Sequence, residues 1–287
     1  MRRILIVLAA LLALAPPASA AGTLRQVTGF GSNPGALQMF EYTPAGLPAG
    51  RPVVVALHGC TEDATYGQNA GWTELADRWK FTVVLPQQVM ANNISKCFNW
   101  FQANDISRGS GEAESIAQMA RRGIADAAGS RAYVTGLSAG GAMTSVMLAA
   151  YPDLFAGGAV VAGLPYGCAT SIVDAYTCMN PGKDLTPKQW GDKVRAASSS
   201  TGPRPGVSIW QGSADFTVNP SNLRELKEQW TDVGATVETH LIIGMGHGQP
   251  VSPGTTDGHC GHAAAYILDV GVCAAWQIGQ FWGIATP

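Results

Sequence analysis

Residues 136–140 read Gly-Leu-Ser-Ala-Gly, a Gly-x-Ser-x-Gly pattern with Ser138 at its centre. The apolar run 131–135 before it is typical of a short buried strand, and residues 139–151 after it carry helix-forming residues with apolar side chains at helical spacing. A sharp strand-to-helix turn that holds a serine in strained backbone geometry leaves no room for side chains at the flanking glycines. The pattern therefore predicts that Ser138 is a nucleophile.

A serine hydroxyl is a weak nucleophile at neutral pH and needs a base to accept its proton. Imidazole suits this role because it titrates near neutrality, and a carboxylate on its second nitrogen fixes the tautomer and stabilises the imidazolium. Asp215 follows the strand-like run 206–210, and His247 follows the strand-like run 236–243. We therefore expect Ser138, His247 and Asp215 to form a catalytic triad for acyl transfer.

Other residues could in principle fill two of these roles. Asp153 and Asp174 are alternative acids, but neither follows a strand at the required place. His240 lies within a strand-like run, where packing or surface exposure is the expected role, and His259 and His262 are not followed by a helix–strand unit. The positions of Asp and His after strands favour the triad above.

The tetrahedral intermediate of acyl transfer carries an oxyanion, which backbone N–H groups must stabilise. Ala139, the residue after the nucleophile, is expected to supply one donor. Cys60, in the loop that follows the apolar run 52–57, is expected to supply the second. His58 in the same loop is expected to shape it rather than to transfer protons.

The chain that positions these residues alternates strand-like and helical segments. Repeated βα units imply an α/β fold with a mostly parallel sheet and helices on both faces, in which the chemistry lies beyond the carboxyl ends of the strands. The order Ser, Asp, His is that of the α/β-hydrolase fold. Buried strands are expected at residues 52–57, 81–86 and 131–135, further strands of the sheet at 156–162 and 206–210, and the last strand at 236–243. An antiparallel edge strand is expected at 37–42, and helices at 69–79, 112–128, 139–151, 220–230 and 272–282.

Residues 164–204 lack clear periodicity and contain Pro, Gly and two cysteines. They are expected to form an excursion over one end of the sheet, a candidate lid or substrate-binding cap. The chain shows no Pro/Thr/Ser-rich linker, internal repeat or low-complexity tract. Residues 21–287 are therefore expected to form a single domain.

Residues 1–20 have the pattern of a secretory signal peptide. Arg2 and Arg3 precede an apolar run, and residues 18–20 read Ala-Ser-Ala, so cleavage is expected after Ala20. The apolar run is shorter than the roughly 20 residues that a membrane span needs. The mature chain is therefore expected to be exported, to the periplasm or the extracellular medium, without a membrane anchor.

The mature chain keeps 16 of the 18 Lys and Arg residues and all 20 Asp and Glu residues, a formal net charge of −4. This balance provides no basic surface for nucleic acid or anionic lipid. Charged residues make up 13% of the chain, against about 25% in an average globular domain, which favours apolar or neutral substrates.

Six cysteines remain after export, and an even number in an oxidising compartment favours disulfides, of which six cysteines allow 15 connectivities. Nearest-neighbour pairing would join Cys60 to Cys97, Cys168 to Cys178 and Cys260 to Cys273. The run 259–262, His-Cys-Gly-His, could indicate a metal site, but an oxidised cysteine between two loop histidines is the favoured interpretation, and no metal is expected.

Several motifs occur in one order along residues 36–282. Together they resemble the polyhydroxybutyrate depolymerase-like esterases, a group that includes the type 1 catalytic domain of extracellular short-chain polyhydroxyalkanoate depolymerases and is similar to feruloyl and acetylxylan esterases. The motifs are Leu-His-Gly-Cys at 57–60, Cys-Phe-Asn-Trp-Phe at 97–101, Arg-Gly-Ser-Gly-Glu at 108–112, Gly-Leu-Ser-Ala-Gly-Gly-Ala-Met at 136–143, Trp-Gln-Gly-Ser-Ala-Asp at 210–215 with Val218 and Pro220, and Gly-His-Gly at 246–248.

The resemblance implies a single α/β-hydrolase domain, no cofactor and the triad given above. It also implies that Cys60 lies in the oxyanion loop, that a disulfide joins Cys60 to Cys97, and that Trp100 lines the acyl cleft, with core packing as the alternative for Trp100. Secreted polymer depolymerases of this family usually append a linker and a polymer-binding domain, which residues 21–287 lack. Oligomers, amorphous polymer and plant-wall esters therefore remain open as substrates.

The sequence thus predicts an exported serine ester hydrolase that works through an acyl-enzyme, with a polyester, an oligoester or a polysaccharide ester as substrate. A polyhydroxybutyrate depolymerase or oligomer hydrolase is the favoured interpretation, and a feruloyl or acetylxylan esterase is the alternative. A serine peptidase uses the same groups and remains a further possibility. A non-catalytic binding protein on the same fold is disfavoured by the complete triad.

Overall fold

The computed structural model describes residues 22–129 and 131–286, and the signal peptide expected at residues 1–20 lies outside the described residues. Within the described residues, no helix is both long enough and apolar enough to cross a bilayer.

The main sheet has eight strands in the order β1-β2-β4-β3-β5-β6-β7-β8. β2 runs antiparallel to both β1 and β4, and the strands from β4 to β8 are parallel to one another. The strands are β1 (Thr23–Val27), β2 (Gln38–Thr43), β3 (Val53–Leu57), β4 (Thr82–Gln87), β5 (Ala132–Leu137), β6 (Phe155–Val161), β7 (Gly206–Gly212) and β8 (Val237–Ile242).

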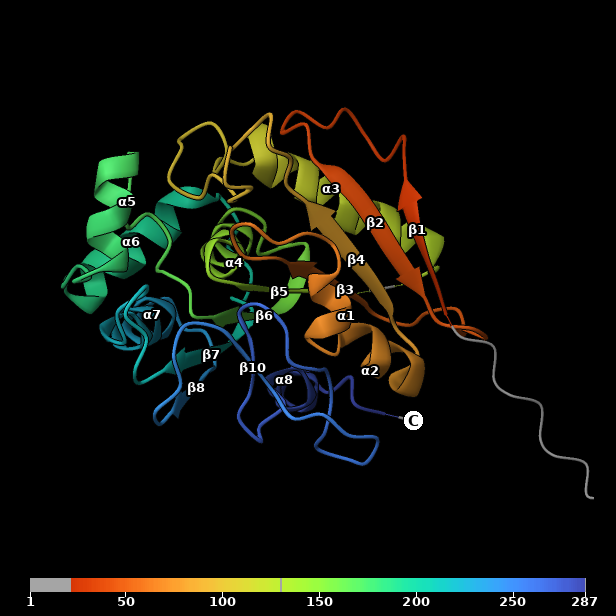
Figure 1. The fold of residues 1–287 in the computed structure, drawn as a ribbon. Coiled ribbons are helices and arrows are strands. Elements are labelled where there is room, and N and C mark those ends of the chain that lie inside the picture. The colour runs from red at the N-terminus through yellow and green to blue at the C-terminus, as the bar shows by residue number, and fades with distance from the viewer. Residues whose placement is uncertain (1–21, 130, 287) are drawn as a thin grey trace, which may run out of the picture.

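Helices cover both faces of this sheet and form two hydrophobic cores (Figure 1). Strand β3 shows why: Val53, Val55 and Leu57 belong to the core under α3, α4 and α7, whereas Val54 and Ala56 belong to the core under α1, α2 and α8. A strand buried on both faces is apolar at every position. The helices are α1 (Tyr66–Asn69), α2 (Trp72–Trp79), α3 (Gly111–Asp126), α4 (Ala139–Ala150), α5 (Ile172–Met179), α6 (Pro187–Ala197), α7 (Ser221–Asp232) and α8 (Ala274–Phe281).

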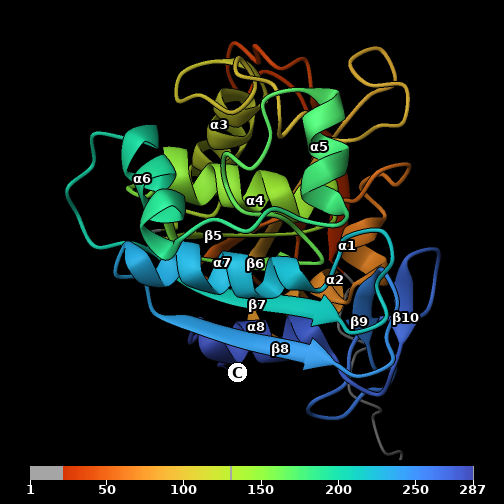
Figure 2. The same ribbon diagram turned by 90° about the vertical axis from the view of Figure 1, so that its left-hand side faces the viewer.

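The carboxyl ends of the parallel strands meet at one end of the molecule. In Figure 2 the arrowheads of β7 and β8 point toward the end where α5 lies, together with the short strands β9 (Gln249–Val251) and β10 (Ile267–Asp269). In an open parallel sheet this end carries the functional residues.

Three details differ from the pattern expected from sequence. The strand near residues 37–42 is antiparallel but is not at the edge, because β1 pairs with its outer side. The helix expected at 69–79 is two helices, since Gly71 adopts a left-handed conformation with φ 87° between α1 and α2. β8 is not the last strand, because β9 and β10 pair in parallel as a separate ribbon.

The excursion at residues 164–204 contains two helices that its sequence pattern did not predict, and they have different surroundings. Helix α6 packs against α7, with the indole Nε1 of Trp190 donating to the carboxylate of Glu225 at 2.6 Å. Helix α5 lies at the carboxyl end of the sheet (Figure 2). Only α5 is therefore placed as a wall or lid would be.

The three disulfides follow the nearest-neighbour pairing. They join Cys60 to Cys97, Cys168 to Cys178, and Cys260 to Cys273. The first two lie beside the carboxyl end of the sheet, in the loop after β3 and in the segment that carries α5.

Candidate active site

Ser138 lies at the sharp turn between β5 and α4. Its backbone has φ 57° and ψ −117°, a conformation that a residue with a side chain rarely adopts. Its N–H donates to the carbonyl of Val161 in the neighbouring strand at 2.9 Å. The turn therefore holds the serine in a strained geometry at the N-terminus of a helix, where the helix dipole is positive.

The glycines around Ser138 are required by close approach of backbones. A Cβ at Gly136 would overlap the carbonyl oxygen of Gly140, and a Cβ at Gly140 would overlap the carbonyl oxygen of Leu57 in β3. A larger residue at either position would push the turn away from the sheet.

His247 and Asp215 come from the loops after β8 and β7 and form a hydrogen bond of 2.8 Å between Nδ1 and Oδ2. The side chain of Asp215 is fully buried. Its Oδ1 accepts the N–H groups of Thr217 and Val218, each at 2.9 Å, and its Oδ2 also accepts from Gln211 Nε2 at 2.9 Å. A carboxylate oxygen accepts hydrogen bonds, so Nδ1 of His247 must be the donor in this contact. The proton of the neutral ring is therefore on Nδ1, and Nε2 is the nitrogen that can accept a proton.

Two features bring these loops together. Ala214 donates its N–H to the carbonyl of Met245 at 2.9 Å, and Gly212 lies so close to this carbonyl that a Cβ would overlap it. Beyond His247, the N–H of Gln249 at the start of β9 donates to the carbonyl of Tyr266 at 2.8 Å. Tyr266 is the last residue of the loop before β10. The ring of Tyr266 lies edge-on to the His247 ring, with centroids 6.2 Å apart.

The loop after β3 is fixed by a buried histidine. His58 Nδ1 contacts the carbonyl of Gly59 at 2.6 Å, and the N–H of Gln88 donates to His58 Nε2 at 3.0 Å. These partners place the proton on Nδ1. Burial lowers the pKa of His58 to about 4, so its ring is a weak base, and its unprotonated Nε2 already accepts the N–H of Gln88.

The same loop is tied to the segment that carries Trp100. The disulfide joins Cys60 to Cys97, and buried Glu112 accepts the N–H of Asn99 at 2.8 Å and its side-chain amide at 2.7 Å. Burial raises the pKa of Glu112 to about 8. Glu112, from the motif at 108–112, thus fixes the segment next to Trp100 through its two hydrogen bonds with Asn99.

A cavity of about 480 Å³ opens between these elements. Ser138, His247, Trp100, Cys60 and Ala139 all line it. All five histidines fall in the described part of the chain, and of these only His247 lines the cavity. The two backbone N–H groups expected to stabilise the oxyanion donate to no protein acceptor within residues 22–129 and 131–286.

Helix α5 forms one wall of this cavity. Ile172, Ala175, Tyr176 and Met179 line it, at the i, i+3, i+4, i+7 spacing of one helix face. This stripe was present in the sequence, but the helix has only two turns and its apolar face could not be assigned to a partner. It is the clearest part of the site that sequence reasoning missed.

Glu62 is the second missed residue, since a single glutamate in a loop gives no sequence signal. It lines the cavity, and its Oε2 accepts the N–H of Gly59 at 2.7 Å. Burial raises the pKa of Glu62 to about 7, although the hydrogen bond from Gly59 acts in the opposite direction. A carboxyl that gains charge near neutral pH therefore lies in the loop that carries Cys60.

Known esterases resemble this chain over most of its length. A family model described as Esterase PHB depolymerase matches residues 37–242, a span that includes Ser138 and Asp215 and ends shortly before His247. Poly(3-hydroxyalkanoate) depolymerase C of Paucimonas lemoignei is 51% identical over 96% of this chain and 74% of its own length.

Acetylxylan esterases are more distant relatives. A probable acetylxylan esterase A of Neosartorya fischeri is 37% identical over 74% of this chain, which spans 60% of that protein's length. The solved acetyl xylan esterase from Aspergillus awamori superposes with a TM-score of 0.77 at 27% identity, over 92% of this chain and all of that one. The chain therefore belongs to the Esterase PHB depolymerase family and is a serine ester hydrolase with the α/β-hydrolase fold.

Proposed function

We propose that Ser138, His247 and Asp215 hydrolyse esters through an acyl-enzyme. The Oγ of Ser138 forms a bond to the ester carbonyl carbon while His247 Nε2 accepts its proton, and the tetrahedral intermediate then expels the alcohol, which takes that proton. Water, deprotonated by the same imidazole, attacks the acyl-enzyme and releases the acid and the free serine. Asp215 keeps His247 in the required tautomer throughout.

The N–H groups of Cys60 and Ala139 are the proposed oxyanion donors. Both residues line the cavity beside Ser138, and Ala139 begins helix α4, so its N–H has no acceptor within the helix. Donors fixed before the reaction stabilise the developing charge without reorganisation. The bonds of His58 and the disulfide at Cys60 support this fixed arrangement.

The substrate that fits best is a short-chain polyhydroxyalkanoate, as a polymer or an oligomer. The observation that carries this proposal is the lining of the cavity beside Ser138 and His247. Helix α5 supplies an apolar wall, and Trp100 and Phe101 supply an aromatic wall. No Lys or Arg is among the described residues that line it. An aliphatic ester chain carries no charge and no hydrogen-bond donor along its repeat. The 51% identity to the Paucimonas lemoignei depolymerase supports the same substrate class.

We also propose that the protein acts outside the cytoplasm. All six cysteines are paired in disulfides, which persist in oxidising compartments.

The test is release of soluble 3-hydroxybutyrate and its oligomers from a suspension of amorphous polyhydroxybutyrate, with wild type and Ser138→Ala run side by side. Release by the wild type alone is the expected result. Hydrolysis of a short activated ester and of acetylated xylan without release from the polyester would overturn the substrate and favour an acetylxylan esterase.

A further inference from the structure

Large apolar side chains gather around the mouth of the active-site cavity. Among the described residues, ten large apolar side chains are exposed, and four of them line this cavity. Two more are direct neighbours of lining residues, Val173 on α5 and Phe216 beside Thr217. We call these six residues the apolar rim: Ile94, Ile172, Val173, Tyr176, Phe216 and Tyr266.

The exposure of the rim is extensive. Phe216 is 86% exposed and Ile94 is 84% exposed, values at which a side chain has almost no packing partner in the protein. Single exposed apolar residues are common, but several around one opening indicate a surface that contacts an apolar partner.

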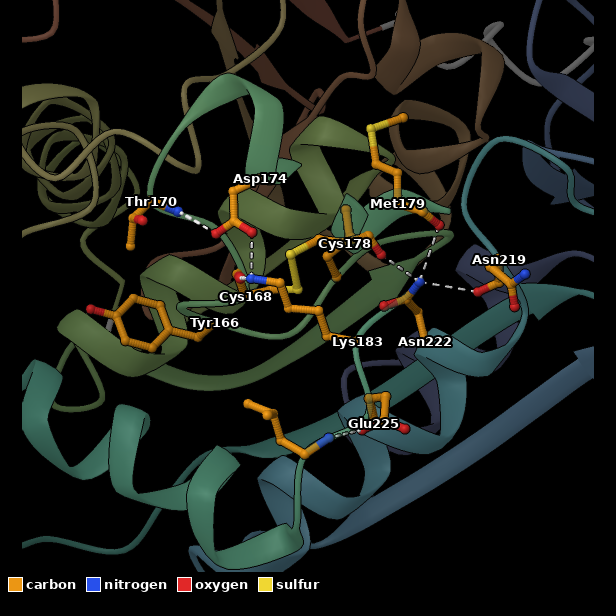
Figure 3. The surroundings of a disulfide bond; sticks show 12 residues. Tyr166, Cys168, Thr170, Asp174, Cys178, Met179, Lys183, Asn219, Asn222 and Glu225 are labelled. Carbon is orange, nitrogen blue, oxygen red and sulfur yellow. Dashed lines mark hydrogen bonds and ion pairs between the residues drawn. A yellow bond between two sulfur atoms is a disulfide. The ribbon is translucent and has the colours of Figure 1, made fainter. Parts of the chain in front are cut away.

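Contacts near both ends of helix α5, which carries three rim residues, join it to neighbouring segments (Figure 3). The disulfide of Cys178 with Cys168 fixes its last turn, and Asp174 in its first turn forms an ion pair with Lys183 at 2.5 Å. Asn222 Nδ2 donates to the carbonyl of Cys178 at 3.1 Å. This helix is therefore a fixed wall.

The other rim residues are held in similar ways. Asn180, just after α5, donates its side-chain amide to the carbonyl of Phe216 at 3.0 Å. Ser95, next to Ile94, accepts the N–H of Thr61 at 2.7 Å. The carbonyl of Tyr266 accepts the N–H of Gln249 at 2.8 Å. A surface fixed before contact loses little conformational entropy on adsorption.

The charges around the rim favour one kind of apolar partner. A protein that adsorbs to a membrane normally places Lys or Arg beside its apolar residues to attract anionic lipids. The rim carries no charged residue. The charge of the nearby Lys183 is balanced by Asp174, and that of Lys96, two residues after Ile94, faces the carboxyl groups of Glu62 and Asp63. A polysaccharide would need hydrogen-bonding groups, whereas four of the six rim side chains, three aliphatic and one phenyl, have none.

We propose that the apolar rim adsorbs the enzyme to the surface of a solid, uncharged polyester, with the cavity mouth facing the polymer. This inference rests on the proposed function, because the surface that the rim contacts is then the substrate that Ser138 cleaves. Chain segments that leave the solid would enter the cavity between α5 and Ile94 without release of the enzyme.

The experiment measures adsorption without turnover. The parent is Ser138→Ala, which cannot digest the solid, and the rim variant adds Val173→Ser and Phe216→Ser. The control variant adds Leu241→Ser and Ile243→Ser on and just after β8; Ile243 is 81% exposed, similar to the rim residues, but neither residue lines the cavity or is next in sequence to a residue that does. Each protein is mixed with amorphous polyhydroxybutyrate granules, and the depletion of the supernatant gives the partition coefficient. Thermal unfolding checks that all three proteins are folded.

The rim variant is expected to bind the granules at least fivefold more weakly than the parent, and the control variant to bind as the parent does. In proteins that retain Ser138, the rim changes are expected to lower the ratio of polymer to soluble-ester hydrolysis by a similar factor. Equal adsorption of the rim variant and its parent, or an equal loss in the control, would overturn the proposal. So would adsorption to phosphatidylcholine vesicles in preference to the granules.

These outcomes are separate from a failure of the proposed function. If the parent adsorbs through the rim but the wild type releases no 3-hydroxybutyrate, the proposed substrate fails and the adsorbing surface stands. If the wild type digests the polymer and the rim variant adsorbs unchanged, the rim proposal alone fails.

Discussion

Oδ2 of Asp215 lies 2.8 Å from Nδ1 of His247, in a carboxylate that also accepts three other hydrogen bonds and is fully buried. A buried carboxylate with this many donors cannot rotate freely, so it dictates the tautomer of the imidazole. The pair links two loops that are 32 residues apart in the chain.

We expect Asp215→Asn to lower kcat/KM for a soluble ester by about 10³- to 10⁴-fold while the fold is retained. An amide that turns its NH₂ toward Nδ1 would favour the tautomer with the proton on Nε2, which cannot accept the proton of Ser138. Steady-state kinetics and thermal unfolding measure the two effects. The control is Asp153→Asn, which removes a surface partner of Arg108 and is expected to change kcat/KM less than twofold. A comparable loss in both variants would contradict the assignment.

Gly140→Ala is expected to destabilise the protein by about 3 kcal/mol or to prevent folding, because the added Cβ would overlap the carbonyl of Leu57 in β3. Strand β3 is buried on both sides and cannot move away. Gly202→Ala is the matched control, since a Cβ there would contact only the hydroxyl of Ser200 at 3.8 Å. Urea unfolding measures both, and a Gly140→Ala protein as stable as the control would show that the turn is not tightly packed.

Glu62 predicts a dependence of stability on pH. Its pKa in the folded protein is about 7, against an ordinary value of 4.5, because burial disfavours the charged form. The folded protein therefore keeps a proton that the unfolded chain has released, and the free energy of unfolding falls as pH rises from about 4.5 to about 7. The expected loss between pH 5 and pH 8 is about 2 kcal/mol.

Glu62→Gln should remove this loss, because the amide oxygen still accepts the N–H of Gly59 but cannot ionise. Its stability relative to the wild type should therefore increase from pH 5 to pH 8, measured by urea unfolding at each pH. Glu62→Ala leaves the Gly59 N–H without its acceptor and should be less stable than Glu62→Gln at both values. A constant difference between wild type and Glu62→Gln would contradict the shifted pKa.

Removing the disulfide under α5 tests how this wall is held. The double variant Cys168→Ser, Cys178→Ser should lose about 2–3 kcal/mol of stability, the value expected for a loop of this length. Hydrogen exchange in residues 172–179 should rise, because the remaining ion pair of Asp174 with Lys183 is partly exposed and constrains the helix less than the covalent bond does. Unchanged exchange in α5 would show that packing alone holds the helix.

Much of the site could be predicted because its residues obey local rules. The glycines at 136 and 140 indicate a turn in which backbones pack closely, and this can be read from the local pattern alone. Asp215 and His247 follow strands of a parallel sheet, whose carboxyl ends lie at one edge. The continuous apolar run of β3 is enough to predict a strand buried on both faces.

The remainder depends on contacts between distant segments. The stripe on α5 has helical spacing, but periodicity does not say which surface a helix will face. β1 and the ribbon of β9 and β10 are defined by their partners, so residues 37–42 could not be recognised as an inner strand. Glu62 and Tyr266 lie in loops, and only the folded structure brings them to the cavity.

The most direct test of the central claim is mass spectrometry of the protein during turnover of a slowly hydrolysed activated ester. In the wild type, we expect a single acyl adduct on the peptide that contains Ser138. In Asp215→Asn the same adduct should form at a much lower rate, and in Ser138→Ala it should not form. Turnover in Ser138→Ala at the wild-type rate, or an acyl adduct on another residue, would contradict the account.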